Sequence, residues 1–146
     1  MTLPPIRRHL LVRATPEHAY RVFTEDIGAW WPLERYSVYE TGNTVAFEGD
    51  AIVERSADGE STVWGRVTAA EPPSRIAFSW HPGDDDERGE VEVTFTSLAD
   101  GRTSVTLVHT GWESYGAAAE TARDDYRNGW PTVMAGFGER AALRVS

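Results

Sequence analysis

The chain has 146 residues, of which 40% are hydrophobic and 11% aromatic, and this composition favours a folded globular protein. Its net charge of −9 comes without a basic block or stripe, so neither nucleic acid nor an anionic membrane is an expected partner. The absence of cysteine and lysine excludes disulfides, thiol nucleophiles and Schiff-base chemistry on a lysine. No stretch has the apolar length of a signal or membrane-spanning segment, so we expect a cytoplasmic protein without membrane insertion.

The N-terminal part predicts one strand followed by two short helices. Residues 6–13 alternate as a strand that places Arg8 on its apolar face. Thr15 is a suitable N-cap and Pro16 a suitable first residue for the helix that follows. Asp26 is expected to cap a second short helix over residues 27–31.

From residue 44 onward the hydrophobic period becomes two, which predicts a run of six strands with hairpin turns at residues 57–60 and 99–102. Within this run, Trp64 is expected to face outward because its neighbours Val63, Gly65 and Val67 alternate to the other side. The acidic segment 82–89 is expected to be an exposed loop. The predicted strands cover residues 44–49, 51–56, 61–70, 75–80, 90–98 and 104–112.

The C-terminal part returns to a helical period. A helix is predicted over residues 115–127, a break at Asn128-Gly129, and a last helix beginning at Pro131. The last helix carries one apolar stripe that should cover a sheet: Trp130, Val133, Met134, Phe137 and Ala141. Strands grouped together with segregated helices indicate an α+β fold with an antiparallel sheet.

Four segments in this order resemble a known superfamily: TPEHAYRVFTEDIGAWWP, VWGRVTAAEPPSRIAFSW, EVEVTFTSLADGRTSVTLVHTGW and GWPTVMAGF. The chain is similar to the START-like, birch-pollen-allergen-like superfamily (SRPBCC), also called the polyketide cyclase/dehydrase and lipid transport group. Within it, the chain resembles the bacterial branch of activator of heat-shock protein 90 ATPase homologues. The resemblance implies a helix-grip fold over residues 1–146 as one domain: a seven-stranded antiparallel sheet curled around a long C-terminal helix, often with a cavity between them.

Two polar side chains lie on faces that should be buried, His109 with Val105 and Leu107, and Arg8 on the first strand. His109 is interpreted either as a core histidine bonded to a neighbour or as a polar contact in a partly polar cavity. For Arg8 we expect a strand end that reaches solvent; if it points inward, it suits a ligand carboxylate.

Large aromatic residues facing a long helix leave irregular gaps that can form a pocket. We therefore expect a ligand site of several hundred cubic ångströms. Its predicted residues are Trp31, Gly65, Phe78, Trp80, Phe95, Leu107, His109, Trp130, Met134, Phe137 and, if it points inward, Arg8. The acidic run and the four histidines show neither calcium-loop nor zinc spacing, so no metal and no cofactor are expected.

Three functions are compatible with the sequence. The leading hypothesis is a binding protein for a small apolar or aromatic ligand. The second is a cyclase or hydrolase with His109 as general acid–base, which requires a solvent-connected cavity and a second polar group beside it. The third is a chaperone-ATPase regulator or another protein-binding module. Fold does not decide among them, and the oligomeric state, a homodimer included, stays open.

Overall fold

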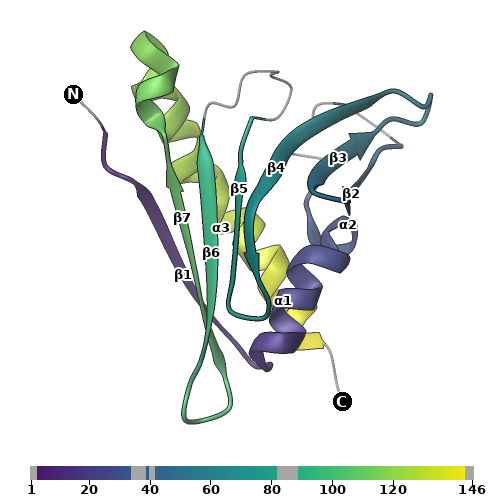
Figure 1. Cartoon of the computed structure of the whole chain (residues 1–146), viewed down its shortest axis with the longest axis vertical. Helices are drawn as coiled ribbons and strands as arrows, with labels where there is room; N and C mark the ends of the chain where they lie inside the picture. Colours follow the sequence, from purple (N-terminus) through teal and green to yellow (C-terminus); the bar gives the residue numbers. More distant parts are fainter. Residues whose placement is uncertain (1–2, 34–38, 40–41, 82–88, 144–146) are drawn as a thin grey trace.

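Seven strands form one antiparallel sheet in the order β1-β7-β6-β5-β4-β3-β2 in the computed structural model (Figure 1). The structure describes residues 3–33, 39, 42–81 and 89–143, so most of the predicted acidic loop lies outside the described residues. The strands are β1 (Ile6–Val12), β2 (Thr44–Glu48), β3 (Ala51–Arg55), β4 (Ser61–Glu71), β5 (Arg75–Ser79), β6 (Glu90–Ser97) and β7 (Thr103–Thr110).

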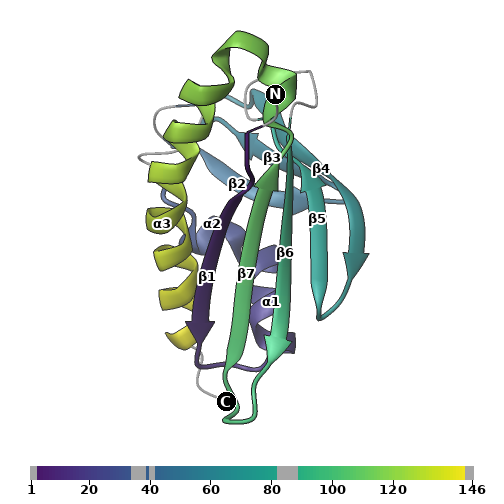
Figure 2. The same cartoon turned by 90° about the vertical axis from the view of Figure 1, so that its left-hand side faces the viewer.

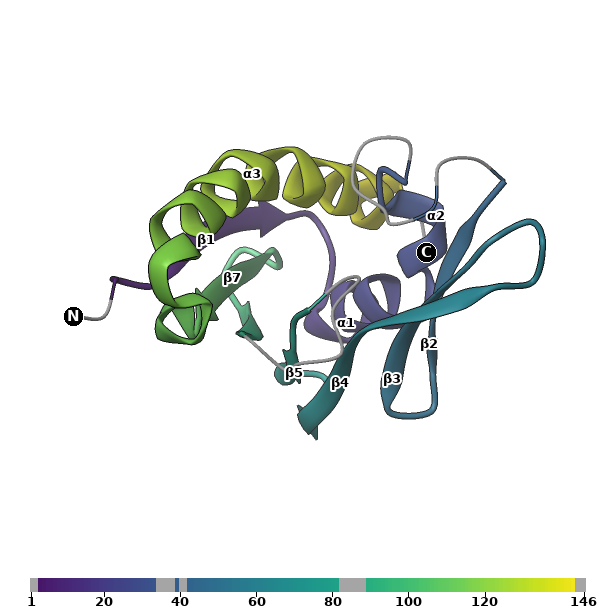
Figure 3. The same cartoon turned by 90° about the horizontal axis from the view of Figure 1, so that it is seen from above.

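The helices lie within the curl of this sheet. Seen from above, the sheet bends around α1 (Pro16–Glu25), and α3 (Ala119–Leu143) crosses its open side (Figure 3). Figure 2 shows α3 running beside the β1 edge. A short helix α2 (Ile27–Trp30) follows α1, and a 3₁₀ segment η1 (Trp112–Ala118) precedes α3. The predicted α+β helix-grip architecture is confirmed.

The first helix begins as its sequence predicts, because the Thr15 hydroxyl accepts a hydrogen bond from the backbone N–H of His18 at 3.2 Å. The expected cap of the second helix is wrong. Asp26 precedes α2, but its side chain makes no capping hydrogen bond. Its carboxylate lies 3.7 Å from the Arg140 guanidinium of α3 instead, which links the two helices.

The two-residue period holds in the central strands. Val91, Val93 and Phe95 are buried in β6, while the intervening residues are partly or fully exposed. In β7 the same alternation buries His109 with Val105. These two strands pair without a register shift, so nothing disturbs the period that the sequence predicts.

The outward orientation predicted for Trp64 is wrong, because β4 carries a β-bulge there. Ile52 pairs with Gly65 and the next residue, Val53, pairs with Val63, which leaves Trp64 as the extra residue. Both Trp64 and its neighbour Gly65 are buried as a result.

The bulge also creates a polar contact that periodicity does not predict. The Trp64 indole N–H donates to a carboxylate oxygen of Glu54 at 2.9 Å, and Glu54 itself is fully buried. The other carboxylate oxygen accepts from the backbone N–H of Tyr39 at 3.0 Å and from the Asn43 amide at 2.7 Å. The buried carboxylate is thus satisfied by several neutral donors.

The predicted break at Asn128-Gly129 is also wrong, since α3 runs without interruption through Pro131. Proline has no N–H, so the Arg127 carbonyl loses the partner that it would have four residues later. The Arg8 guanidinium supplies a replacement: its Nη2 donates to the Arg127 carbonyl at 2.8 Å. Arg8 therefore does not lie at a strand end reaching solvent. It is partly buried in the middle of β1 and completes the hydrogen bonding of α3.

Replacing Arg8 with methionine is expected to lower the free energy of unfolding by about 1–2 kcal/mol, since it removes a charged donor from a helix carbonyl. Urea denaturation followed by circular dichroism measures the change. Arg7→Met, on the exposed face of the same strand, is the control and should change the stability by less than about 0.5 kcal/mol.

A double-mutant cycle gives the sharper test. Pro131→Ala supplies the backbone N–H donor that the Arg127 carbonyl lacks. Arg8→Met should therefore lower the free energy of unfolding by less in that background. Equal costs in the two backgrounds would show that Arg8 does not substitute for the missing hydrogen bond.

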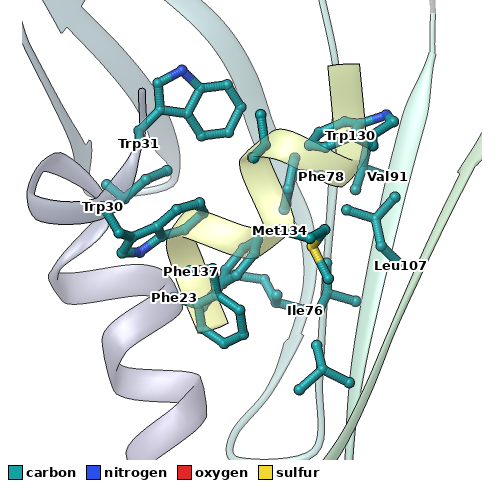
Figure 4. Packing of buried hydrophobic residues seen from close by; sticks show 14 of the residues in the cluster. Phe23, Trp30, Trp31, Ile76, Phe78, Val91, Leu107, Trp130, Met134 and Phe137 are labelled. Carbon is teal, nitrogen blue, oxygen red and sulfur yellow. The ribbon is translucent and has the colours of Figure 1, made fainter. Parts of the chain in front are cut away.

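The helices and the sheet enclose an aromatic core. Figure 4 shows Phe137 of α3 packed beside Phe23 and Trp30, with ring centroids 5.5 and 5.4 Å apart. Every residue of the predicted apolar stripe on α3 is at most 4% exposed. In the described part of the chain, no helix is both long and apolar enough to cross a membrane.

Candidate functional site

A cavity of about 160 Å³ lies between α3, the end of β5 and the segment after α2. Three tryptophans from these separate parts of the chain contribute to its lining, and Figure 4 shows two of them, Trp31 after α2 and Trp130 on α3. The surface is almost entirely apolar. The lining residues that the structure describes are Trp31, Trp80, Asp125, Tyr126, Gly129, Trp130 and Val133.

The ring geometry makes this a box rather than a flat wall. The rings of Trp31 and Trp130 are nearly perpendicular, at 89°, with centroids 6.1 Å apart. The Trp80 ring packs against both, with its centroid 5.6 Å from that of Trp31 and 5.5 Å from that of Trp130. Tyr126 stacks on Trp130 at 6.2 Å and an interplanar angle of 27°. The aromatic rings that line the cavity therefore also contact one another at different angles.

Tyr126 has a hydroxyl with a perturbed pKa in this environment. Burial raises the pKa of its hydroxyl far above the ordinary value, and the nearby Tyr115 and Asp125 raise the pKa further. Contact with the Trp80 indole N–H opposes these effects. The hydroxyl consequently stays protonated at neutral pH and can donate a hydrogen bond at the edge of the box.

His109 lies behind this box and does not line it. Its Nδ1 accepts a hydrogen bond from the Trp130 indole N–H at 3.1 Å. The centroid of its ring lies 4.3 Å from that of Trp112 and 4.9 Å from that of Tyr126. The backbone carbonyl of His109 also accepts from the Trp112 indole N–H at 3.1 Å. His109 thus bonds to Trp130 and packs against Tyr126, the two aromatic residues of α3 that line the cavity.

The protonation state of His109 follows from this contact. The side chain is fully buried, and burial lowers its pKa from 6.5 to about 3. Because Nδ1 accepts from Trp130, the neutral ring carries its proton on Nε2. A general acid–base near neutral pH needs a pKa near the working pH, so this environment does not favour that role.

The other predicted site residues lie in different places. Arg8 bonds to the carbonyl of Arg127, and Gly65 packs beneath the Ser79 carbonyl in the bulged part of the sheet. The remaining predicted residues belong to the buried core outside the cavity lining: Phe78, Phe95, Leu107, Met134 and Phe137. Three of the predicted site residues do line the cavity, and these are Trp31, Trp80 and Trp130.

Four lining residues were not among those predicted: Asp125, Tyr126, Gly129 and Val133. The spacing of Tyr126, Trp130 and Val133 at intervals of four and three residues places them on one helical face. That signal was present in the sequence. The break predicted at Asn128-Gly129 assigned Tyr126 and Trp130 to different helices and concealed it.

A family model described as Activator of Hsp90 ATPase homolog 1-like protein matches residues 13–142. The chain belongs to this family. The match spans α1, strands β2 to β7 and nearly all of α3, including every described residue that lines the cavity. No curated protein matches the chain in sequence.

Solved structures extend the relationship to the SRPBCC group. The anthrahydroquino-γ-pyrone synthase Txn09, complexed with SUM, is 30% identical at a TM-score of 0.62, covering 94% of this chain and 97% of that protein. The self-sacrificing resistance protein CalC from Micromonospora echinospora is 22% identical, with a TM-score of 0.65 and 94% coverage of both chains. The Aha1 dimer from Colwellia psychrerythraea is 16% identical, with a TM-score of 0.61 and coverages of 97% and 98%. The latter two share the fold with this family member.

Proposed function

We propose that this family member binds a small apolar or aromatic molecule in the cavity between its sheet and α3. The observation that carries the proposal is the partly open cavity lined by Trp31, Trp80 and Trp130, whose surface is almost entirely apolar. Small-molecule sites are concave, largely apolar and rich in aromatic side chains.

The size of the cavity limits what it can enclose. The expectation of several hundred cubic ångströms exceeds the observed volume of about 160 Å³. An apolar cavity of about 150 Å³ is large enough to bind benzene. We therefore propose that one ring, or one group of similar size, enters the box while the rest of the ligand remains outside it.

The similarity to the synthase Txn09 supports an aromatic ligand. That protein is 30% identical over nearly the whole of both chains, and its name denotes a product with fused rings. A flat fused-ring compound matches a cavity in which one ring packs against several indole rings. The core residues Phe78, Phe95, Leu107, Met134 and Phe137 then support the site from within and contact a ligand only when the box widens.

A single-ring probe tests the proposal directly. Titration with p-cresol, followed through the indole N–H signals of the six tryptophans by two-dimensional NMR, should shift the signals of Trp31, Trp80 and Trp130. Native mass spectrometry of the purified protein, with extraction of bound molecules, identifies the natural ligand in the same preparation.

A cavity-filling variant provides the control. Val133→Phe places a ring in the cavity and should abolish the p-cresol shifts. Ala135→Phe adds the same ring to an exposed position of α3 and should leave them unchanged. If p-cresol still binds to the Val133→Phe protein, the ligand site lies outside this cavity.

The two alternatives have less support. His109 lies outside the cavity lining with a low pKa, which disfavours a cyclase or hydrolase that uses it as acid–base. Protein-binding surfaces commonly expose apolar patches, whereas Leu11 is the only large hydrophobic side chain exposed among the described residues. A homodimer stays a prediction, which size-exclusion chromatography with light scattering tests.

A further inference from the structure

We infer that the box is an aromatic cage for a positively charged group, such as a trimethylammonium or another alkylammonium, carried by the ligand. Four rings surround the space: Trp31, Trp80, Tyr126 and Trp130. This inference rests on the proposed function, because it names the chemistry of the group that enters the same cavity.

Ring geometry is the first argument. The face of an aromatic ring carries the negative part of its quadrupole, and a cation is attracted within about 6 Å of the ring centroid. Trp31, Trp80 and Trp130 pack against one another, with the planes of Trp31 and Trp130 nearly perpendicular, and all three contribute to the lining of the same cavity. A group enclosed in about 160 Å³ touches several rings at once, so their attractions add.

The charges around the cavity are the second argument. Asp125 is exposed and contributes to the lining, and its carboxylate lies close enough to the Tyr126 hydroxyl to influence it. None of the lining residues that the structure describes is basic. The whole chain carries a net charge of −9. The Asp125 carboxylate at the rim, the ring faces and the overall negative charge therefore favour a cation over an anion at this site.

The nearly apolar lining is the third argument. Few polar atoms face the space, so a neutral polar group would lose its hydration without gaining hydrogen bonds. An alkylammonium is different because its methyl groups contact the apolar surface while its diffuse charge is stabilised by ring faces. Tryptophan is the strongest of the aromatic residues for this interaction and supplies three of the four rings.

A matched pair of probes separates charge from shape. Choline and 3,3-dimethylbutan-1-ol have the same branched outline, but only choline is charged. Isothermal titration calorimetry should give a dissociation constant for choline about tenfold lower than for the neutral alcohol, as expected for a cation–π contact in a largely desolvated site. The tryptophan N–H signals should locate both probes in the cavity.

Two variants test the sources of the preference. Trp31→Leu keeps an apolar wall but removes a ring face, so choline should bind about tenfold more weakly and the alcohol less than about twofold more weakly. Asp125→Asn should weaken choline binding about two- to fivefold and leave the alcohol unchanged. Asp124→Asn makes the same charge change at an exposed neighbour outside the lining and should have no effect on either probe.

The outcomes distinguish this inference from the function on which it rests. Equal affinity for choline and the neutral alcohol, or binding of p-cresol without binding of choline, would overturn the cage and retain the aromatic-ligand site. Absence of p-cresol, choline and alcohol binding would overturn both. If Trp31→Leu does not fold, the cage is still tested by comparing choline with the neutral alcohol in the wild type and in Asp125→Asn. Asp125 is exposed, so its replacement leaves the packing intact.

Discussion

Replacing Gly65 with alanine is expected to prevent stable folding, with a loss of at least about 3 kcal/mol in the free energy of unfolding. A Cβ at this position would lie 1.8 Å from the backbone carbonyl oxygen of Ser79. Because the obstacle is main chain, no rotamer change relieves it, and β4 and β5 would have to separate. Soluble yield and urea denaturation measure the effect.

Gly138→Ala is the matched control in α3. Its Cβ would lie 3.0 Å from the Cδ2 atom of Leu10, the flexible end of a side chain. Alanine is favoured over glycine in a helix by about 1 kcal/mol, so this variant should be neutral or stabilising. A Gly65→Ala protein as stable as Gly138→Ala would show that the sheet can open at the bulge without cost.

The second large effect is the acid sensitivity that His109 confers on the fold. Its pKa is about 3 in the folded protein and 6.5 when exposed, so the unfolded chain takes up the proton first. The stability contributed by the neutral ring is complete above pH 6.5 and is lost as the pH falls toward 3. The loss is about 2 kcal/mol at pH 5 and on the order of 4 kcal/mol near pH 3.

His109→Asn isolates this contribution, because the Asn carbonyl oxygen can accept from the Trp130 indole in place of Nδ1 but does not titrate. The variant should be less stable than the wild type at pH 7.5 and should lose about 2 kcal/mol less between pH 7.5 and pH 5. Urea titrations of both proteins at the two pH values measure the difference. Parallel pH profiles would mean that His109 is not held neutral by burial.

These expectations also explain why the histidine lies on a buried strand face. His109 accepts the indole N–H of Trp130, which otherwise would be buried without a partner in the aromatic core. His109 therefore has a structural role at the cavity, because it orients Trp130, which belongs to the cavity lining. The sequence predicted the burial of His109, but a cavity-lining role required knowing which of several stacked rings faces the empty space.

The sequence alone determined the features that depend on local periodicity and capping. Alternation predicted β6 and β7, Thr15 predicted the start of α1, and the apolar stripe from Trp130 to Ala141 predicted the buried face of α3. The family resemblance supplied the topology of the sheet and the long C-terminal helix. Each feature follows from neighbours along the chain or from a pattern spread over most of it.

The tertiary structure alone decided the features that depend on contacts between distant segments. A bulge against β3 turned Trp64 inward, and Arg8, 119 residues away from Arg127, allowed α3 to continue through Pro131. That continuity places Tyr126 on the same helical face as Trp130 and completes the aromatic box. Periodicity records which face of an element is apolar, but a bulge or a replaced hydrogen bond depends on a partner that only folding brings into contact.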